Sequence, residues 1–421
     1  MKKFTIIALA LCLAVALSTP VMAVDADFSG AYRVRGMYTE HWDLRDTSAS
    51  NAFMNMRFRL QTVFKASDIL SVTVRIDALD GSTWGDATAT AASFDRAYMT
   101  IKTDFGKFDI GRQKGGTWGT TFIDNEADVD RIKLTKTIDD LTLYLVFQKT
   151  TEKDGLWSTD TPTDDVADYD SDTYYFLAKQ KMENLTAGVL LAFNNDKTNA
   201  DQTTHKYSAI PYFVGKFGPL AIQGELAYNW GETDYDTVGA ADLDFKELAY
   251  NLEASFNLGP ASLMAGYAFI SGDNDGTDDN EDSAYGNVGG DWEKLFILTT
   301  DEVDALVNLG GYGNLSDNGI TASGSTAGAK ILYGGATFSP LDNLTLGVVV
   351  GKADADKAPA TYKDDYGVEY DFTLNWKIYD NLTYNAIVAF LDAGDYFYQG
   401  TTKPDNFEDT YALFHQLQLS F

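Results

Sequence analysis

Cysteine is almost absent from this chain of 421 residues, in which Cys12 is the only one. It lies in an N-terminal stretch that opens with two lysines, continues as an apolar core from Phe4 to Leu17 and ends on small residues. These features are typical of a secretory signal peptide, so we predict that residues 1–23 are removed and that 24–421 form one mature domain. A mature chain without cysteine has no disulfide, no thiolate metal site and no cysteine nucleophile.

Long apolar runs and positive charge are also scarce. Beyond the N-terminal stretch there is no run of about 18 apolar residues, so we expect no membrane-spanning helix. Lysine and arginine number 32 against 62 acidic residues, and a net charge of −30 argues against nucleic acid as a partner. The three histidines, His41, His205 and His415, are far apart in the sequence, and we predict no catalytic, cofactor or metal site.

The last residues alternate with a period of two, which is the period of a β-strand. One face of "TYALFHQLQLSF" carries Tyr411, Leu413, His415, Leu417, Leu419 and Phe421, and its last three residues are apolar up to the end of the chain. Such a strand needs an apolar environment at its very end. The alternative is an edge strand of a soluble sandwich.

Short turns recur along the chain and define a repeated hairpin. Four turns open the next strand in nearly the same way, as in Asp139-Asp140-Leu141-Thr142 and Asp380-Asn381-Leu382-Thr383. The repeat holds two strands of about ten residues, a short turn and a longer loop, which is the unit of transmembrane barrels. A propeller has a similar period but needs four short strands per blade.

Alternation within the strands fits a barrel but does not say which face lies inside. Val72, Val74 and Ile76 oppose Thr73 and Arg75, and a soluble barrel would show the same pattern. The export signal, the terminal phenylalanine and the unequal loops together favour an all-β transmembrane antiparallel barrel with short periplasmic turns and long extracellular loops. We predict about eighteen strands, with sixteen as the alternative: 28–38, 53–65, 68–79, 93–103, 107–113, 131–137, 140–150, 172–182, 185–194, 205–217, 219–231, 244–258, 261–271, 327–338, 344–353, 365–378, 382–394 and 408–421.

The segment 272–326 is about twice as long as an ordinary loop. Thr299 and Glu302 have the spacing of a helix capping box and precede a short apolar pattern, which predicts a short helix. The competing interpretation is an extra hairpin within 291–313 that begins at "WEKLFILT".

Every arginine lies at or before position 131. Alternation turns most of them, and one lysine, away from the apolar face, so we predict a basic wall inside the barrel formed by Arg33, Arg35, Arg57, Arg59, Arg75, Arg96, Arg131 and Lys133. The alternative is that these side chains only pair with carboxylates on the same wall.

An acidic, glycine-rich stretch separates the fifth and sixth predicted strands. We predict a constriction loop over 114–130 that carries Asp124, Glu126, Asp128 and Asp130. If the loop folds inward, its carboxylates face the arginines across a narrow, water-filled lumen and create a transverse field. The alternative is a solvated loop outside the barrel.

The stretch "FDRAYMTIKTDFGKFDIGRQKGGTWGTTFID" resembles the part of general diffusion porins that leads through "G-x-F-D-x-G-R" into their constriction loop. The matching residues are Arg96, Gly106, Phe108, Asp109, Gly111 and Arg112. The resemblance gives Arg96 and either Arg57 or Arg59 the wall positions of the eyelet, and Asp124 and Glu126 the loop role. The loop is shorter than in that family and the strand count differs, so 272–326 is an alternative constriction element.

The whole chain is also similar to outer-membrane homotrimeric porins of sulfate-reducing bacteria, with which it shares the signal peptide and the start "VDADFSGAYRVRG". This resemblance implies a porin for passive diffusion of small hydrophilic solutes and ions across the outer membrane of a Gram-negative bacterium. The implied partners are outer-membrane lipid and lipopolysaccharide, two further copies of the chain, and a barrel-assembly machinery that reads Phe421. The alternatives are a substrate-specific channel for a sugar or small anion, a barrel enzyme and a structural surface protein.

Overall fold

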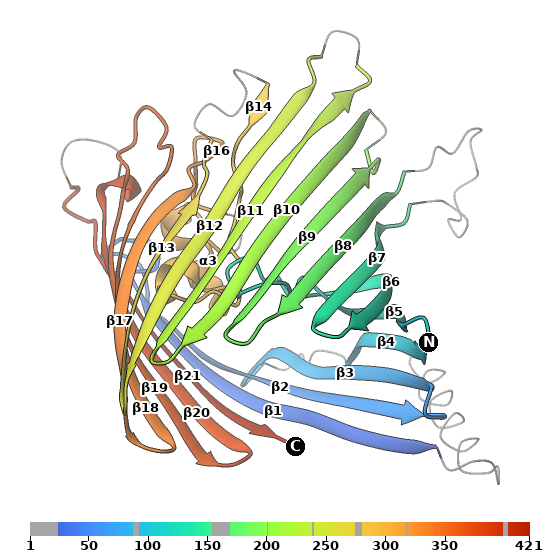
Figure 1. The fold of residues 1–421 in the computed structure, drawn as a ribbon. Coiled ribbons are helices and arrows are strands. Elements are labelled where there is room, and N and C mark those ends of the chain that lie inside the picture. The colour runs from blue at the N-terminus through green and yellow to red at the C-terminus, as the bar shows by residue number, and fades with distance from the viewer. Residues whose placement is uncertain are drawn as a thin grey trace.

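The computed structural model is a closed antiparallel β-barrel (Figure 1). It describes residues 24–421 except 87–91, 154–168, 200, 238–239, 274–279, 317–318 and 399–402. The predicted signal peptide, 1–23, lies outside the described residues.

Eighteen long strands form the barrel wall, which confirms the predicted fold class and settles the strand count at eighteen. The strands are β1 (Asp25–Glu40), β2 (Asn51–Lys65), β3 (Leu70–Thr83), β4 (Ser93–Lys102), β5 (Lys107–Gly115), β6 (Ala127–Ile138), β7 (Leu141–Thr151), β8 (Ser171–Lys181), β9 (Leu185–Asp196), β10 (Gln202–Phe217), β11 (Leu220–Tyr235), β12 (Leu243–Leu258), β13 (Ala261–Ile270), β17 (Ala329–Leu341), β18 (Leu344–Asp354), β19 (Asp365–Tyr379), β20 (Leu382–Ala393) and β21 (Thr410–Ser420). Each of them overlaps one predicted strand.

The barrel closes where β1 pairs with β21, from Ala31 opposite Ser420 to Glu40 opposite Tyr411. Beyond this ladder, Gly30 and Phe421 exchange both backbone hydrogen bonds, at 2.8 and 3.0 Å. A Cβ on residue 30 would lie 2.7 Å from the ring of Phe421, so glycine leaves the space in which the terminal ring packs. The C-terminal residue is therefore part of the seam.

The predicted short turns connect the strands at one end of the barrel. Two-residue turns, such as 139–140 and 259–260, reverse the chain through a residue with positive φ, here Asp139 at 51° and Gly259 at 75°. Glycine and aspartate tolerate this conformation better than most residues. At the other end, the connections are longer.

Side-chain exposure shows which face of the wall points outward. Phe28, Leu145 and Phe372 are 64%, 53% and 59% exposed, whereas their neighbours along each strand turn into the barrel. The apolar positions of the alternating pattern therefore face outward, and the polar positions face the lumen. None of the helices among the described residues is long and apolar enough to cross a membrane.

Between β13 and β17, the chain folds into the barrel interior, and we call residues 283–327 the insert (Figure 1). It contains two single-turn helices, α2 (Phe296–Thr299) and α3 (Asp304–Val307), and the 3-10 turn η1 (Leu309–Gly311). The predicted helix is thus present as α3, but the predicted capping box was wrong. Thr299 ends α2, and the residue before α3 is Val303, which makes no side-chain cap. The competing hairpin was also wrong, because "FILT" is helical.

The insert packs against lumen-facing residues of β17–β21. Trp292, Leu295 and Leu306 are at most 1% exposed and belong to one apolar cluster with Tyr366 and Leu391 of the wall. Small wall residues make this close approach possible. A Cβ on Gly351 would lie 2.5 Å from Leu295, and Ala389 is fully buried.

Two buried wall carboxylates fix the start of α2. Asp371 accepts a hydrogen bond from the amide of Phe296 at 2.9 Å, and Glu369 accepts those of Ile297 and Leu298 at 2.5 and 3.1 Å. The first amides of a helix have no partner inside the helix, so these carboxylates replace the missing side-chain cap. The short β14 (Glu281–Asp282), β15 (Thr321–Ala322) and β16 (Ser325–Thr326) and the 3-10 turn η2 (Asp395–Phe397) complete the described elements.

Candidate functional site

The residues of the predicted basic wall come from five of the six strands β1–β6. Arg33 and Arg35 come from β1, Arg57 and Arg59 from β2, Arg75 from β3, Arg96 from β4, and Arg131 and Lys133 from β6. The register places Arg33 directly opposite Arg57 and Arg75 directly opposite Arg96. Like charges in such positions repel one another, so the cluster requires acidic partners.

Some of the acidic partners of these arginines belong to the same wall. The Arg59 guanidinium holds both oxygens of Asp77, with contacts of 2.5–3.0 Å, and Asp77 is 3% exposed. Arg33 and Arg57 each lie 3.8 Å from Asp80. The alternative that the arginines pair with carboxylates of their own wall therefore describes much of the cluster.

The β5–β6 hairpin brings further carboxylates to the arginines. β5 pairs with β4 only from Lys107 to Arg112, yet it continues beside β6 as far as Gly115. The upper part of the hairpin thus leaves the wall, and we call its tip, residues 116–126, the inner loop. A Cβ on Gly116 would lie 1.9 Å from the carbonyl oxygen of Asn125, so the tip closes only with glycine there.

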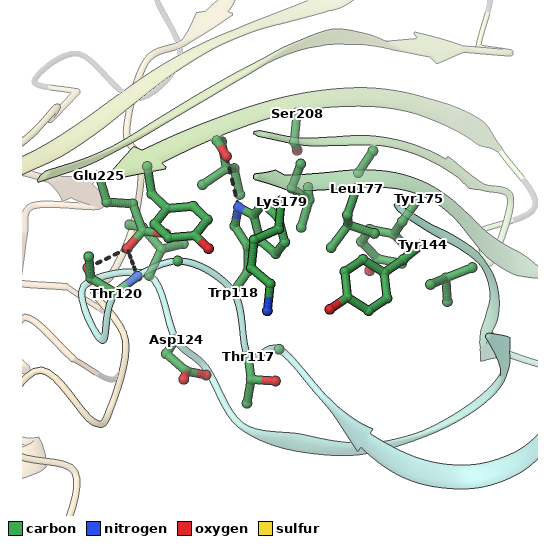
Figure 2. A pocket seen from close by; sticks show the side chains of 18 of the residues that line it. Thr117, Trp118, Thr120, Asp124, Tyr144, Tyr175, Leu177, Lys179, Ser208 and Glu225 are labelled. Carbon is green, nitrogen blue, oxygen red and sulfur yellow. Dashed lines mark hydrogen bonds between the residues drawn. The ribbon is translucent and has the colours of Figure 1, made fainter. Parts of the chain in front are cut away.

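The inner loop crosses the lumen and attaches to the opposite wall (Figure 2). The Trp118 indole donates to the carbonyl of Ile210 on β10 at 2.9 Å. The backbone amide and hydroxyl of Thr120 both donate to Glu225 of β11, at 3.0 and 2.5 Å. On the far side, the fully buried Phe122 packs edge-on against Trp292 of the insert. The loop is therefore held at three points.

Of the four predicted loop carboxylates, two reach the arginines. Glu126 contacts Arg96 at 2.7 Å and Lys114 at 2.5 Å. Asp128 bridges Arg75 and Arg96 at 2.6 and 2.5 Å. Lys114 and Arg96 lower the pKa of Glu126 despite its partial burial, which keeps this carboxylate ionised. These contacts are direct, rather than a field across an open gap.

Asp128 and Asp130 do not belong to the loop, contrary to our expectation. β6 begins at Ala127, four residues earlier than predicted, so Asp128 and Asp130 are both strand residues. Because Arg131 and Lys133 face the lumen, alternation turns Asp130 outward. There it pairs with Arg112 at 3.2 Å, and both side chains are at least half exposed.

Asp124 makes no ion pair with the arginines among the described residues. Its backbone packs against Gly289 of the insert, and Gly289 donates to the carbonyl of Phe122 at 2.8 Å. Burial, and then the nearby Asp291 carboxylate, raise the pKa of Asp124 to about 6. Asp124 thus titrates close to neutral pH, unlike Glu126.

The insert supplies acidic groups that the sequence-based prediction of site residues left out. Glu302 forms an ion pair with Arg35, and Arg35 is only 6% exposed. Burial, followed by Asp301 and Asp291, raises the pKa of the Glu293 carboxyl to about 7. The acidic residues of "DWEK" and "TTDEVD" were the available signal, but "TTDEVD" was interpreted as a helix capping box and "WEK" as the start of the competing hairpin.

A possible metal-ligand group lies away from this cluster. His205, Glu232 and Asp234 bring ligand atoms within 4.8 Å of one another on the outward side of β10 and β11. These side chains are partly or fully exposed, and no other observation in the described part of the chain indicates a bound ion, so we assign them no role.

The comparisons with known proteins agree with this architecture. A family model described as Gram-negative porin matches residues 8–387. No curated protein matches the chain.

Three solved structures from Pseudomonas aeruginosa have a similar fold. OccK8 (OprE) has a TM-score of 0.56 and 14% identity, with 94% of this chain and 98% of that chain covered. OccK11 (OpdR) has a TM-score of 0.54 and 12% identity, with 94% and 96% covered. OccK5 (OpdH) has a TM-score of 0.53 and 12% identity, with 94% and 98% covered. At such identities the likeness concerns the fold alone.

Proposed function

Because the chain belongs to the Gram-negative porin family and forms a porin channel of the outer membrane, we propose that small hydrophilic solutes and ions diffuse passively through its lumen. The arginine cluster and the acidic groups of the inner loop and insert would set the ion selectivity. Among porins, this behaviour is that of the general diffusion type.

The observation that carries the proposal is the β5–β6 hairpin, whose inner loop crosses the lumen and which brings Glu126 of the loop and Asp128 at the start of β6 onto the arginines. Arg96 touches both Glu126 and Asp128, so the two signs of charge meet at one place in the lumen. The Debye length is about 8 Å at physiological ionic strength. A charge closer than this to the ion path therefore still attracts or repels a passing ion. Charges on the exposed loops act from farther away and are screened more strongly.

Bilayer recordings in a salt gradient test this assignment. Replacing Arg57, Arg59 and Arg96 by alanine leaves Asp77 without its main partner and removes one of the two basic partners of Glu126 and of Asp128, so the reversal potential should shift toward cations. Replacing Glu126 and Asp128 by glutamine and asparagine should shift it toward anions. The matched control removes three exposed lysines, Lys363, Lys377 and Lys403, and should shift it far less. If the lysine control shifts the potential at 1 M salt as much as the arginine variant, these arginines do not control selectivity.

We also propose that the protein assembles as a homotrimer in contact with outer-membrane lipid and lipopolysaccharide, and that the barrel-assembly machinery reads Phe421. The position of Phe421 in the seam, beside Gly30 and within 6.4 Å of the Phe58 ring, supports a role late in closure. Deletion of Phe421 should lower the yield of heat-modifiable trimer, and an unchanged yield would contradict this role.

A further inference from the structure

A cavity of about 950 Å³ lies between the inner loop and the wall formed by β6–β11 (Figure 2). It is distinct from the arginine cluster, because only Arg131 and Lys133 of the predicted basic wall line it. Trp118 and Asp124 of the loop form one side, and lumen-facing residues of the strands form the other.

The register arranges the strand side of this cavity in rows. One row runs from Tyr144 through Leu177 and Leu190 to Ile210, and three of its four members are aliphatic. The next row, toward the short turns, places Lys179 opposite Gly188, followed by Tyr212 and Glu225. An apolar band thus lies directly beside a row that contains a cation.

Lys179 differs from the other cations of the cavity. Lys206 pairs with Glu247 at 2.6 Å, Lys133 lies 3.6 Å from Asp109, and Arg131 donates to the backbone carbonyl of Lys114. Lys179 has no ion pair and no hydrogen bond to any other described residue, and its side chain projects into the cavity (Figure 2).

The lining is basic although the protein is strongly acidic. Four cations and two carboxylates line the cavity, in a chain with a net charge of −30. Glu225 is 3% exposed and is already bonded to Thr120, so it is committed to holding the loop. Because Glu247 and Asp109 compensate Lys206 and Lys133 from outside the lining, the positive charge that an entering solute meets is chiefly that of Lys179.

Aromatic rings complete the surface next to Lys179. A Cβ on Gly188 would lie 2.6 Å from Tyr212 and 3.0 Å from Trp118, so the glycine makes space for both rings beside the lysine. The two rings pack edge to face, with centroids 5.0 Å apart. Together with Leu177 and Leu190, they offer a surface for an apolar body about the size of a phenyl ring.

We propose that this cavity is a binding station for small organic anions that carry an apolar body, with Lys179 holding the anionic group and the Trp118–Tyr212 pair and the aliphatic row contacting the body. The inference rests on the proposed diffusion function and adds a solute preference to it. The station would slow such solutes on their way through the lumen and enrich them there.

Single-channel recording of the full mature protein tests the station with three probes. Phenylacetate has both parts, acetate has the anion alone, and phenylethylammonium has a similar body with the opposite charge. We expect phenylacetate to block the current, acetate to bind on the order of tenfold more weakly, and phenylethylammonium not to block. The variant Lys179→Gln should weaken block by phenylacetate on the order of tenfold.

Lys181→Gln is the matched control, since it removes the same charge from the same strand at a residue that does not line the cavity. It should leave the block unchanged. Potassium chloride conductance of each variant shows that the channel is folded. Equal block in Lys179→Gln and the parent protein, or equal affinity for acetate and phenylacetate, would overturn the station while leaving diffusion intact. A protein that conducts no ions at all would instead overturn the proposed function.

Discussion

The lumen-facing positions on β17–β21 and on β7–β10 follow the same alternation but carry different side chains. On β17–β21 many of them are apolar or small, such as Ile331, Ala389 and Leu391, which are all fully buried under the insert. The exceptions there include Glu369 and Asp371, whose carboxylates bond amides of the insert. On β7–β10 they include Gln148, Thr173, Asn194 and Lys206, which line the cavity. One half of the interior is thus a packed core like that of a soluble protein, and the other half is the wall of an aqueous space.

This difference shows that "inside" has two physical meanings in one barrel. At a lumen position beneath the insert, as in the core of a soluble protein, side-chain volume and burial determine how much a substitution lowers stability. A lumen position beside the cavity tolerates a polar substitution as a protein surface does, because water can solvate the new group. On the outward face, which contacts lipid, a charged substitution destabilises the barrel.

Arginine substitutions at three positions separate these environments, and we expect the largest effects here. Ala389→Arg would force a long, charged side chain into the core and should cost several kcal/mol. Leu145→Arg, in the middle of the outward apolar band of β7, should cost roughly 2–4 kcal/mol in the membrane. Thr142→Arg, three residues away on the lumen side, should cost less than about 1 kcal/mol because water reaches it.

Urea unfolding of the barrel in liposomes measures these costs, and channel conductance reports whether Ala389→Arg expels the insert instead. Similar costs for Thr142→Arg and Leu145→Arg would mean that the inside and outside faces are assigned wrongly. A mild effect of Ala389→Arg on both stability and conductance would contradict the packed half.

A smaller effect should follow from pH on the aqueous side. Asp124 has a pKa of about 6, raised by burial and by Asp291, so it loses its charge as the pH falls from 7 to 5. Cation permeability should decrease over this range with a midpoint near 6. Asp124→Asn should remove the step, whereas a step of the same size in that variant would assign it to another group.

The same shift has a consequence for stability. The folded-state pKa of Asp124 is raised above its ordinary value of 3.8, so protonation favours the docked loop. This contribution is present at low pH and is lost as the pH rises through about 6.

Much of the fold was predictable because alternation and turn chemistry are local. Each strand records its two faces in its own sequence, and turns such as Asp139-Asp140 mark their ends. The insert was not predictable in the same way. Its position depends on complementarity between distant residues, such as Leu295 and Gly351, and neither is unusual in its own segment.

The site was predictable in part for a related reason. The arginines share one face by alternation, and that holds in each strand separately. The assignment of Asp130 to the loop or to the strand depended on where β6 begins. A hairpin that leaves the wall moves that boundary by several residues. The pairing of Glu302 with Arg35 depended on a segment that folds back into the barrel, and no local sequence pattern encodes that. The run of small and apolar lumen residues on β18–β21 was the one signal that could have revealed a packed half.

Cysteine accessibility tests the division of the interior most directly, because the predicted mature chain has no cysteine of its own. Ser208→Cys places a thiol on the cavity wall, and Ala412→Cys places one at a lumen position that is 1% exposed beneath the packed cluster. A hydrophilic, membrane-impermeant thiol reagent should label the first on the order of a hundredfold faster than the second, because labelling of the second requires the insert to open. Equal labelling rates in the folded protein would contradict a packed half and an aqueous half.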